Sequence, residues 1–481
     1  MTDTIPGEKA HGSSEEPSSQ QAEIFERPTG LKGFYYNPYT QVVMLGFVCF
    51  LCPGMFNALT GLGGGGQVDA KTAANANCTL YSTLAFFSFF TGSVNNVLGS
   101  RLTLVLGTWG YSLYIASFLA VNIHPGAGDF VTTAGAILGI CASLLWTAQG
   151  SLMLAYPTEA QKGRFIGIFW AIFNLGAVVG ASAGGVGNGT YIGFLVLSLI
   201  GVCMPIFMAD PSKMIRTDGT KVAKVQHPTW KHEFYSLYVA LRTDPLILLL
   251  FPMFFASNYF YTWQFDDYNG ALFNIRTRSL NNLVYWSSQI LGSIAIGFVL
   301  DTPRLRRRVR AFSGWAILFV MVFAVHGWAY YYQKFAYRPS IVVRQSSILL
   351  SRGYTRATAT ATMDLSDKGY AAHCWLIIFY SLLDAMWQTT AYWLMGAMSN
   401  DPAKLAVFTG FYKSIQSAGA AGVWRADAIN LPFMNIFAST WALTAAGLVI
   451  ALPMVYMRVR DSSEDDQTYE KKAESLDILT T

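Results

Sequence analysis

The sequence predicts an all-α polytopic membrane protein in which twelve transmembrane helices form two six-helix halves. Of the 481 residues, 53% are apolar and only 13% are charged, whereas a soluble domain carries about 25% charged residues. The apolar residues gather in runs of roughly 18–26, long enough to cross ~30 Å of hydrocarbon as a helix. A polar stretch at 210–244 separates six such runs from six others. These three observations define the expected fold class.

The composition also excludes several classes of protein. An apolar share this high is unlike a disordered chain or an ordinary soluble enzyme, and the six cysteines lie mostly inside apolar runs, unlike a secreted disulfide scaffold. The net charge of +5 is modest and unevenly placed along the chain, so we expect no nucleic-acid partner. The sequence shows no catalytic triad pattern, metal-ligand spacing or phosphate-binding loop. We therefore expect no enzymatic activity, no catalytic residues, no cofactor and no bound metal.

The spans follow one another with short polar connections. Backbone polar groups in lipid must be satisfied within the segment, and the runs lack the alternation of a barrel strand, so we expect helices. We place them near residues 41–62, 79–98, 102–122, 131–155, 165–187, 191–209, 245–264, 282–300, 311–330, 371–397, 404–423 and 434–457.

The remaining segments complete the domain organisation. Neither end carries a basic and apolar signal-peptide pattern, and both are polar. We expect a disordered cytosolic tail at 1–38, an N-terminal half at 39–209, a cytosolic central loop at 210–244, a C-terminal half at 245–457 with a long outer loop at 331–370, and a cytosolic tail at 458–481. No function is predicted for the long outer loop.

Counting basic residues predicts the orientation. With both termini in the cytosol, 22 Lys and Arg lie in inner segments, 10 lie in outer loops and one lies within a span. Six of the outer ten belong to 331–370, and long loops obey the positive-inside rule poorly. Two sequons, at Asn77 and Asn188, fall on the expected outer side and are candidate glycosylation acceptors. The pattern does not distinguish the plasma membrane from the vacuole or the endoplasmic reticulum.

Two loops in equivalent places of the two halves share a pattern. The second half has Gly297, Asp301 and Arg304 in this order, and the first half has Gly92, Asn96 and Arg101. Both loops resemble the signature loop of the major facilitator superfamily, in which a glycine and an acid precede basic residues. A carboxylate there can pair with arginines and bind the N-terminus of a neighbouring helix, forming an inner gate. The alternative is that the arginines only set topology. The candidate gate residues are Gly297, Asp301, Arg304, Arg306 and Arg307 in the second half, and Gly92, Asn96, Gly99 and Arg101 in the first, where Asn96 replaces the acid.

The fifth span contains regularly placed glycines. They resemble the superfamily's antiporter motif, but Ala181 stands where the motif has proline. Close packing between helices is the alternative that we favour. The glycines are Gly167, Gly176, Gly180, Gly184 and Gly185.

Four longer stretches carry a more specific resemblance. They are Cys52-Pro-Gly-Met-Phe-Asn57-Ala-Leu-Thr-Gly61-Leu-Gly, Tyr156-Pro-Thr-Glu159 with Lys162-Gly-Arg164, Phe169-Trp170-Ala-Ile-Phe173-Asn174-Leu-Gly176, and Gly410-Phe-Tyr412-Lys413-Ser-Ile-Gln416-Ser-Ala-Gly419. Together they resemble the uncoordinated-ninety-three-like branch of the major facilitator superfamily in its fungal form. The resemblance implies twelve helices and a membrane location but no substrate. Some animal members are associated with receptor trafficking or channel regulation.

Two opposite charges lie at membrane depth. Asp384 is about 13 residues and Lys413 about 9 residues from the inner ends of their spans, which correspond to ~20 and ~14 Å at ~1.5 Å per residue. A lysine side chain can bridge that difference, so we expect that the two can pair. Such a pair would bind a solute or coupling ion, or would fix packing. A third possibility is that the two residues face different surfaces.

Further polar residues are expected around the centre. In the superfamily's fold the first, fourth, seventh and tenth helices line the cavity, which implicates Asn57, Gln149, Asn258 and Gln388 beside Asp384. An acid, neutral amides and nearby aromatic rings would suit a small cationic or amphipathic solute. Each amide alone could equally be an interhelical contact.

Two functions remain open from the sequence. The leading hypothesis is a secondary transporter that moves a small solute or ion by alternating access. The alternative is a non-transporting membrane scaffold that regulates or escorts a membrane-protein partner.

Overall fold

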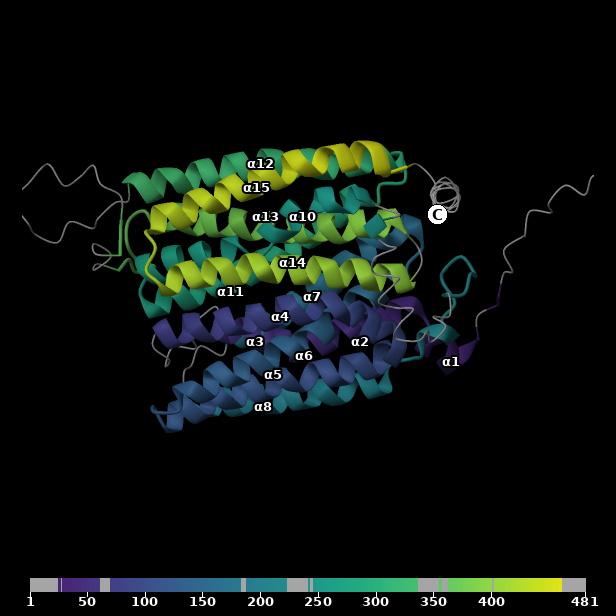
Figure 1. Ribbon diagram of the computed structural model, residues 1–481, viewed down its shortest axis with the longest axis horizontal. Helices are drawn as coiled ribbons and strands as arrows, with labels where there is room; N and C mark the ends of the chain where they lie inside the picture. Colours follow the sequence, from purple (N-terminus) through teal and green to yellow (C-terminus); the bar gives the residue numbers. More distant parts are fainter. Residues whose placement is uncertain are drawn as a thin grey trace, which may run out of the picture.

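A computed structural model describes residues 25–26, 28–60, 70–182, 187–222, 241–242, 245–335, 354–356, 362–399 and 402–460. Within these ranges the chain forms a bundle of long, roughly parallel helices (Figure 1). The predicted glycines Gly184 and Gly185, most of the two predicted tails, and residues 223–240 of the central loop lie outside the described residues.

The elements are named in chain order. They are α1 (Gly30–Tyr35), α2 (Pro38–Leu51), α3 (Pro53–Thr60), α4 (Ala70–Leu98), α5 (Ser100–Ile123), α6 (Gly128–Ala155), η2 (Glu159–Gln161), α7 (Lys162–Ser182), α8 (Asn188–Cys203), η3 (Met204–Phe207), η4 (Pro211–Lys213), η5 (Pro245–Leu250), α10 (Phe251–Ala256), the π-helix η6 (Thr262–Gly270), α11 (Ile275–Leu300), α12 (Arg307–Phe335), α13 (Tyr370–Met398), α14 (Pro402–Ala428) and α15 (Phe433–Arg458).

The described helices make twelve rods, because α2 continues into α3, α8 into η3, and η5 through α10 into η6. In this part of the chain, eight helices are long and apolar enough to cross a membrane. The rods that fall short of that measure are α4, the seventh rod, α13 and α14. Each of these contributes polar or aromatic side chains to the central cavity described below, so their lower hydropathy reflects what they face.

The first six rods lie on one side of the bundle and the last six on the other (Figure 1). Between the two sides, α4 packs along α14 and α7 packs along α11. Small residues permit the close approach: a Cβ at Gly410 would lie 2.7 Å from the Ser88 carbonyl oxygen, and one at Gly297 would lie 2.9 Å from the Gly163 carbonyl oxygen. This is the small-residue packing typical of membrane helices.

The first rod shows how sequence sets its ends and its bend. The Asn37 side chain accepts a hydrogen bond from the Tyr39 N–H at 2.9 Å, and Pro38 occupies the first turn, where its missing N–H costs nothing. The rod breaks at Cys52 because Pro53 cannot donate to the preceding turn. The helix α1 precedes this rod, so regular structure begins before the boundary expected at residue 38.

The seventh rod is the least regular. It begins as a 3-10 helix, forms the short α10, turns at residues 257–259 and continues as η6. Pro252 lies in the first turn of α10, and the α-helical ladder ends at Ser257. Interrupted helices of this kind occur beside binding sites in transporters, and π-helices are frequent at functional sites.

The bundle has two end faces, at which the helices begin and end. The termini face contains Pro38, Asp301 and Arg458, and the opposite face contains Thr60, Asp267 and Asp427. On the opposite face, the Arg356 Nη2 lies 3.5 Å from Asp267 Oδ1 and 2.5 Å from Asp427 Oδ1. Part of the long loop thus ties η6 to the end of α14.

The other contacts of Arg356 fix it in place. Its Nε donates to the Leu431 carbonyl oxygen at 2.9 Å, and its guanidinium lies over the Phe433 ring. The Asp267 side chain is 0% exposed, whereas that of Arg356 is 28% exposed. Arg356 therefore supplies the positive charge beside a carboxylate that has little access to water.

Replacing Arg356 is expected to destabilise the protein. In Arg356→Ala the buried Asp267 carboxylate loses its counter-charge, and removal of one partner of a buried pair costs on the order of 3 kcal/mol. Thermal unfolding of the detergent-solubilised protein measures the loss. Lys368→Ala, an exposed cation of the same loop, is the control and should unfold like the parent. Adding Asp267→Asn to Arg356→Ala should restore part of the stability, and no restoration would contradict the charge argument.

Candidate functional site

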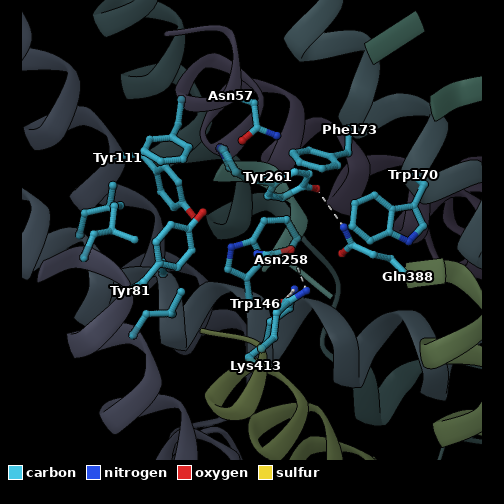
Figure 2. A pocket seen from close by; sticks show the side chains of 17 residues that line it. Asn57, Tyr81, Tyr111, Trp146, Trp170, Phe173, Asn258, Tyr261, Gln388 and Lys413 are labelled. Atoms are coloured by element: carbon cyan, nitrogen blue, oxygen red, sulfur yellow. Dashed lines mark hydrogen bonds between the residues drawn. The ribbon is translucent and has the colours of Figure 1, made fainter. Parts of the chain in front are cut away.

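A cavity of about 600 Å³ lies at the centre of the bundle, between its two sides (Figure 2). Helices from both sides supply its wall. The lining residues are Pro53, Phe56, Asn57, Leu80, Tyr81, Leu84, Tyr111, Leu138, Ala142, Trp146, Trp170, Phe173, Asn258, Tyr261, Gln388, Lys413 and Gln416. The wall is thus mostly apolar and aromatic with a few converging polar groups, as expected of a small-molecule site.

Four of the six predicted binding residues line this cavity: Asn57, Asn258, Gln388 and Lys413 (Figure 2). Asn258 lies in the break of the seventh rod, and its Oδ1 accepts a hydrogen bond from Gln416 Nε2 at 3.0 Å. Gln388 Nε2 donates to the Tyr261 hydroxyl at 3.0 Å. The amides are therefore joined to neighbours and also border the empty space.

Lys413 brings a positive charge to the wall. Its Nζ donates to Gln416 Oε1 at 2.8 Å and lies 4.4, 5.1 and 5.7 Å from the ring centroids of Trp146, Tyr412 and Tyr392. The lysine is only 4% exposed. Aromatic faces stabilise an ammonium by cation–π attraction, most strongly where water is scarce. Trp146 comes from the first side of the bundle, so the ammonium sits between rings from both sides.

Asp384 does not line the cavity and does not pair with Lys413, which corrects the expected ion pair. The Asp384 Oδ2 accepts hydrogen bonds from the Tyr261 hydroxyl at 2.8 Å, the Tyr285 hydroxyl at 3.0 Å and Gln289 Nε2, and its Oδ1 accepts one from Gln388 Nε2 at 2.8 Å. Four neutral donors thus satisfy the carboxylate. The ammonium has its own partners among Gln416 and the rings, so no direct bridge is needed.

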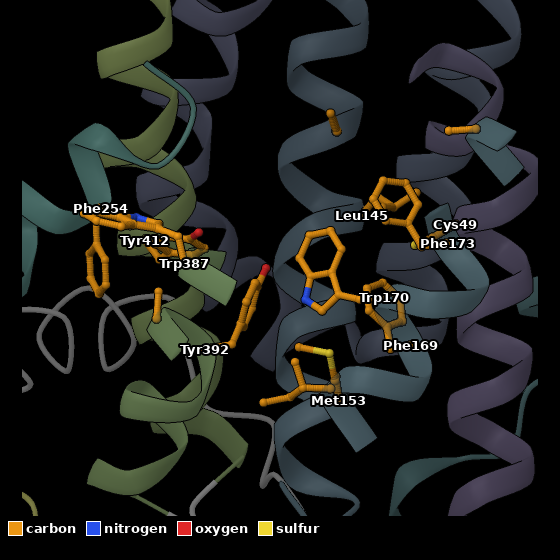
Figure 3. Close-up of a cluster of buried hydrophobic side chains, with 14 of the residues drawn as sticks. Cys49, Leu145, Met153, Phe169, Trp170, Phe173, Phe254, Trp387, Tyr392 and Tyr412 are labelled. Carbon is orange, nitrogen blue, oxygen red and sulfur yellow. The ribbon is translucent and has the colours of Figure 1, made fainter. Parts of the chain in front are cut away.

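Gln149 lies between the cavity and the termini face. Its Oε1 is 3.4 Å from the hydroxyl of Tyr392, which donates to it, and its Nε2 is 3.2 Å from Met153 Sδ. Tyr392 also packs against Trp170, with ring centroids 6.3 Å apart (Figure 3). These side chains form a buried floor from both sides of the bundle. Gln149 is therefore part of the floor and not of the cavity wall.

The termini face is closed around the N-terminus of α7. Asp301, just beyond α11, accepts hydrogen bonds from the Gly163 N–H at 2.8 Å and the Arg164 N–H at 2.5 Å. An anion is favoured there by the unpaired N–H groups and the helix dipole. Burial raises the pKa of Asp301 to about 6, because desolvation outweighs the lowering effect of the two backbone donors.

The expected arginine partners do not contact this carboxylate. Arg304 and Arg306 are exposed, and Arg307 donates to the Ala397 carbonyl oxygen. The partners of Asp301 are backbone groups because the end of α11 meets α7 directly, where Gly163 and Gly297 leave room. The predicted carboxylate is thus placed at a helix N-terminus, while the arginine part of the gate expectation is wrong.

A second contact closes the same face. Lys162, the first residue of α7, donates to the carbonyl oxygens of Gly396 and Ser399 at the end of α13. Arg307 and Arg458 donate to the carbonyls of Ala397 and Met398. Cations are favoured at a helix C-terminus, where the last carbonyls have no partner within the helix.

The first-half copy of the loop is arranged differently. Arg101 donates to the Ile206 carbonyl oxygen, on its own side of the bundle. Asn96 is buried on α4, and Gly99 precedes α5 with a φ of 80°, a conformation that favours glycine. Gly92 packs against α14, where a Cβ would lie 2.9 Å from Val407 Cα.

The described glycines of α7 lie at close helix contacts. A Cβ at Gly176 would lie 2.4 Å from the Phe50 carbonyl oxygen, one at Gly180 would lie 2.3 Å from Ala58 Cβ, and one at Gly167 would lie 3.2 Å from the Ser293 carbonyl oxygen. This geometry is the close packing between helices that we favoured over an antiporter motif.

The two sequons differ in accessibility. Asn188 is exposed at the start of α8, where its Oδ1 accepts a hydrogen bond from Asn122. Asn77 is buried on α4 and lines a second space in the bundle, which corrects its candidacy as a glycosylation acceptor in this conformation.

That second space extends the site towards the opposite face. It measures about 400 Å³ and shares Phe56, Asn57, Tyr81 and Tyr261 with the central cavity. Its other lining residues are Thr60, Asn77, Phe265, Trp286 and Trp424. The empty space thus continues from the centre towards the opposite face, whereas the floor and the α7 contacts close the termini face.

Sequence reasoning missed several lining residues. Gln416 lies one turn beyond Lys413, and its place in the same stretch that carries the family resemblance was the available signal. Three lining residues come from rods that were not expected to line the cavity: Tyr81, Tyr111 and Trp170. Trp146 comes from the expected fourth rod but carries no charge to mark it. The expected set of four lining helices was therefore incomplete.

Comparisons with known proteins agree with this architecture. Residues 64–183 match the family model described as ion channel regulatory protein UNC-93. An UNC93-like protein of Schizosaccharomyces pombe is 44% identical over 93% of this chain and 88% of its own, and UNC93-like protein 1 of Arabidopsis thaliana is 38% identical over 95% and 96%. The solved major facilitator transporter FucP, in the outward conformation, aligns with a TM-score of 0.59 and 11% identity over 89% of this chain and 99% of its own. The chain therefore belongs to the UNC93-like family and has the fold of the major facilitator superfamily.

Proposed function

We propose that this protein is a secondary transporter that moves a small solute through the central cavity by alternating access. The observation that carries the proposal is a cavity at mid-bundle that is closed on one face and continues towards the other. Solute sites in this fold lie near the midplane between the two repeats. By the distribution of basic residues, the termini face would be cytosolic.

The wall of the cavity supports a solute that differs from the sequence expectation. It presents the Lys413 ammonium, four amides and several rings, whereas the Asp384 carboxylate lies outside it. A carboxylate or another oxygen-rich group could displace Gln416 from Lys413, and an apolar body would contact the rings. We therefore favour a small amphipathic solute with an anionic or strongly accepting group over a cation.

The closing contacts support a rocking motion. Gly163, Arg164 and Lys162 belong to the first side, while Asp301 and the end of α13 belong to the second. If the sides rotate apart at the termini face, these hydrogen bonds are exchanged for water.

The regulatory alternative draws on one observation, the description of the matching family model as an ion channel regulatory protein. A protein of that kind would not need Lys413 in contact with a solute. The two functions therefore differ in what substitution of Lys413 does.

Replacing Lys413 is expected to weaken solute binding. In Lys413→Gln the cavity loses its positive charge but keeps a polar side chain, and uptake of the preferred solute should fall at least ~10-fold, or about 1.4 kcal/mol. Uptake of labelled organic anions, zwitterions and cations into proteoliposomes measures the effect. Arg425→Gln, an exposed cation at the far end of the same helix, is the control. Flux that Lys413→Gln leaves unchanged would refute the site, and no flux of any class together with capture of a membrane-protein partner would favour the regulatory function.

Removing the Asp301 carboxylate is expected to open the termini face. In Asp301→Ala the Gly163 and Arg164 N–H groups lose their acceptor, and an unsatisfied buried donor costs about 1–3 kcal/mol. Labelling of Met153→Cys, placed beneath the cavity floor in a cysteine-free background, by an impermeant maleimide should rise about 10-fold or more. Asp218→Ala, an exposed acid of the same face, should leave labelling unchanged. Equal labelling in both variants would show that Asp301 does not hold this face closed.

A further inference from the structure

The second space is the outer part of an empty path that leads from the opposite face to the central cavity. Phe56, Asn57, Tyr81 and Tyr261 line both spaces, so the two adjoin directly. Hydrogen bonds at the termini face close the other end of this path in the present conformation. A solute that enters from the opposite face therefore meets the wall of the second space before it reaches the centre.

Aromatic rings form most of this outer wall. Phe265 and Trp286 stack with ring centroids 6.0 Å apart, and Phe265 lies 5.4 Å from the Tyr261 ring at the junction with the central cavity. Trp424 contributes a further ring from α14. None of the described residues that line this space carries a charge. Such a wall favours an aromatic or other apolar group, which gains from contact with the rings and from the release of water.

Two amides on the same wall lack a hydrogen-bond partner. In the described part of the chain, no other group hydrogen-bonds the side chain of Asn57 or of Asn77, although both line the second space. Asn77 is only 8% exposed. An amide that is buried without a partner costs free energy, and each amide can both donate and accept. A solute with a hydrogen-bonding group at this depth would satisfy these amides, whereas an all-hydrocarbon tail would not.

The length of the path is set along α14. Lys413 and Trp424 lie 11 residues apart on this uninterrupted helix, which corresponds to ~16 Å along its axis at ~1.5 Å per residue. This separation is also about three full turns at ~3.6 residues per turn, so the two side chains project from the same face of the helix. A compact anion that binds Lys413 does not reach Trp424, whereas an elongated one contacts both.

The wall matches a single negative charge. Among the described residues that line the two spaces, Lys413 is the only charged one, and its ammonium lies between the Trp146 ring and Gln416 (Figure 2). A second negative charge on the solute would stay unpaired where water is scarce, which is costly. The wall therefore favours a solute that carries one negative charge at one end.

We propose that the solute is an elongated amphipathic monoanion that occupies both spaces at once. Its anionic end binds Lys413, a hydrogen-bonding group in its middle binds Asn77, and its aromatic end lies against Trp424. This solute class rests on the proposed function, in which the central cavity holds the solute, but its binding is measured without transport. The second space is thus a binding subsite that selects the solute by its length and by its apolar end.

Two probes test this arrangement by calorimetry on the full-length protein in nanodiscs, after subtraction of the signal of empty nanodiscs. Benzoate reaches only the Lys413 end, whereas N-benzoylaminohexanoate carries a carboxylate, an amide and a ring in series. The longer probe should bind at least about 10-fold more tightly than benzoate, because it also covers the second space. Lys413→Gln should weaken both probes about 10-fold. Equal affinity of the parent for the two probes would overturn the proposal.

Substitutions in the second space isolate its contribution. Trp424→Ala should weaken the longer probe about 10-fold, and Asn77→Ala should weaken it about 5-fold. Benzoate should bind both variants like the parent, which also shows that they are folded. Thr60→Trp fills the space from α3 and should weaken only the longer probe, so the test does not depend on the folding of Trp424→Ala. Trp375→Ala, an exposed tryptophan of α13, is the control and should leave both affinities unchanged.

The possible results separate the solute class from the transport function. If the substitutions at Trp424, Asn77 and Thr60 leave the affinity for the longer probe unchanged, the extended position of the solute is wrong, while flux that depends on Lys413 would still support transport. Binding of the longer probe without its flux into proteoliposomes would refute transport alone. If neither probe shows binding that depends on Lys413, the solute site and the elongated solute are refuted together.

Discussion

The N-terminus of α7 is the point on which the conformation of this protein depends. Its backbone N–H groups bind the Asp301 carboxylate at the end of α11, and its first side chain, Lys162, binds carbonyl oxygens at the end of α13. The N-terminus of α7 therefore binds the Asp301 anion and also supplies the Lys162 cation to the C-terminus of α13. Both contacts join the two sides of the bundle at the termini face, which is the closed face of the central cavity in this conformation.

The two charges at mid-membrane are kept apart, and each has different surroundings. Lys413 faces the cavity between aromatic rings, whereas Asp384 lies behind Tyr261 and Gln388 among neutral donors. A direct ion pair would have neutralised both groups and left the cavity without a charge. In the observed arrangement the ammonium borders the cavity, while the carboxylate is separated from the cavity by Tyr261 and Gln388.

The sequence was sufficient for the number and order of the spans, because hydropathy and length are imposed by the bilayer itself. It also indicated Asn57, Asn258, Gln388 and Lys413, since polar groups at that depth usually face inward. It failed for Asp384 and Gln149, because the direction of a side chain depends on the rotation of its helix, which depth alone does not fix. For Asp301 the sequence indicated a helix N-terminus as a partner, but not which helix provides it, because backbone donors leave no mark in a residue pattern.

The burial of Asn77 has a consequence for how the chain is made. Sugar transfer to a sequon needs an extended, accessible asparagine and adds a bulky polar group. Once α4 has packed, Asn77 borders the space that leads from the opposite face to the centre, close to Trp424 of α14. An oligosaccharide attached earlier would occupy that space and hold α4 away from α14. An oligosaccharide on Asn77 is therefore incompatible with the packing of α4 in this conformation.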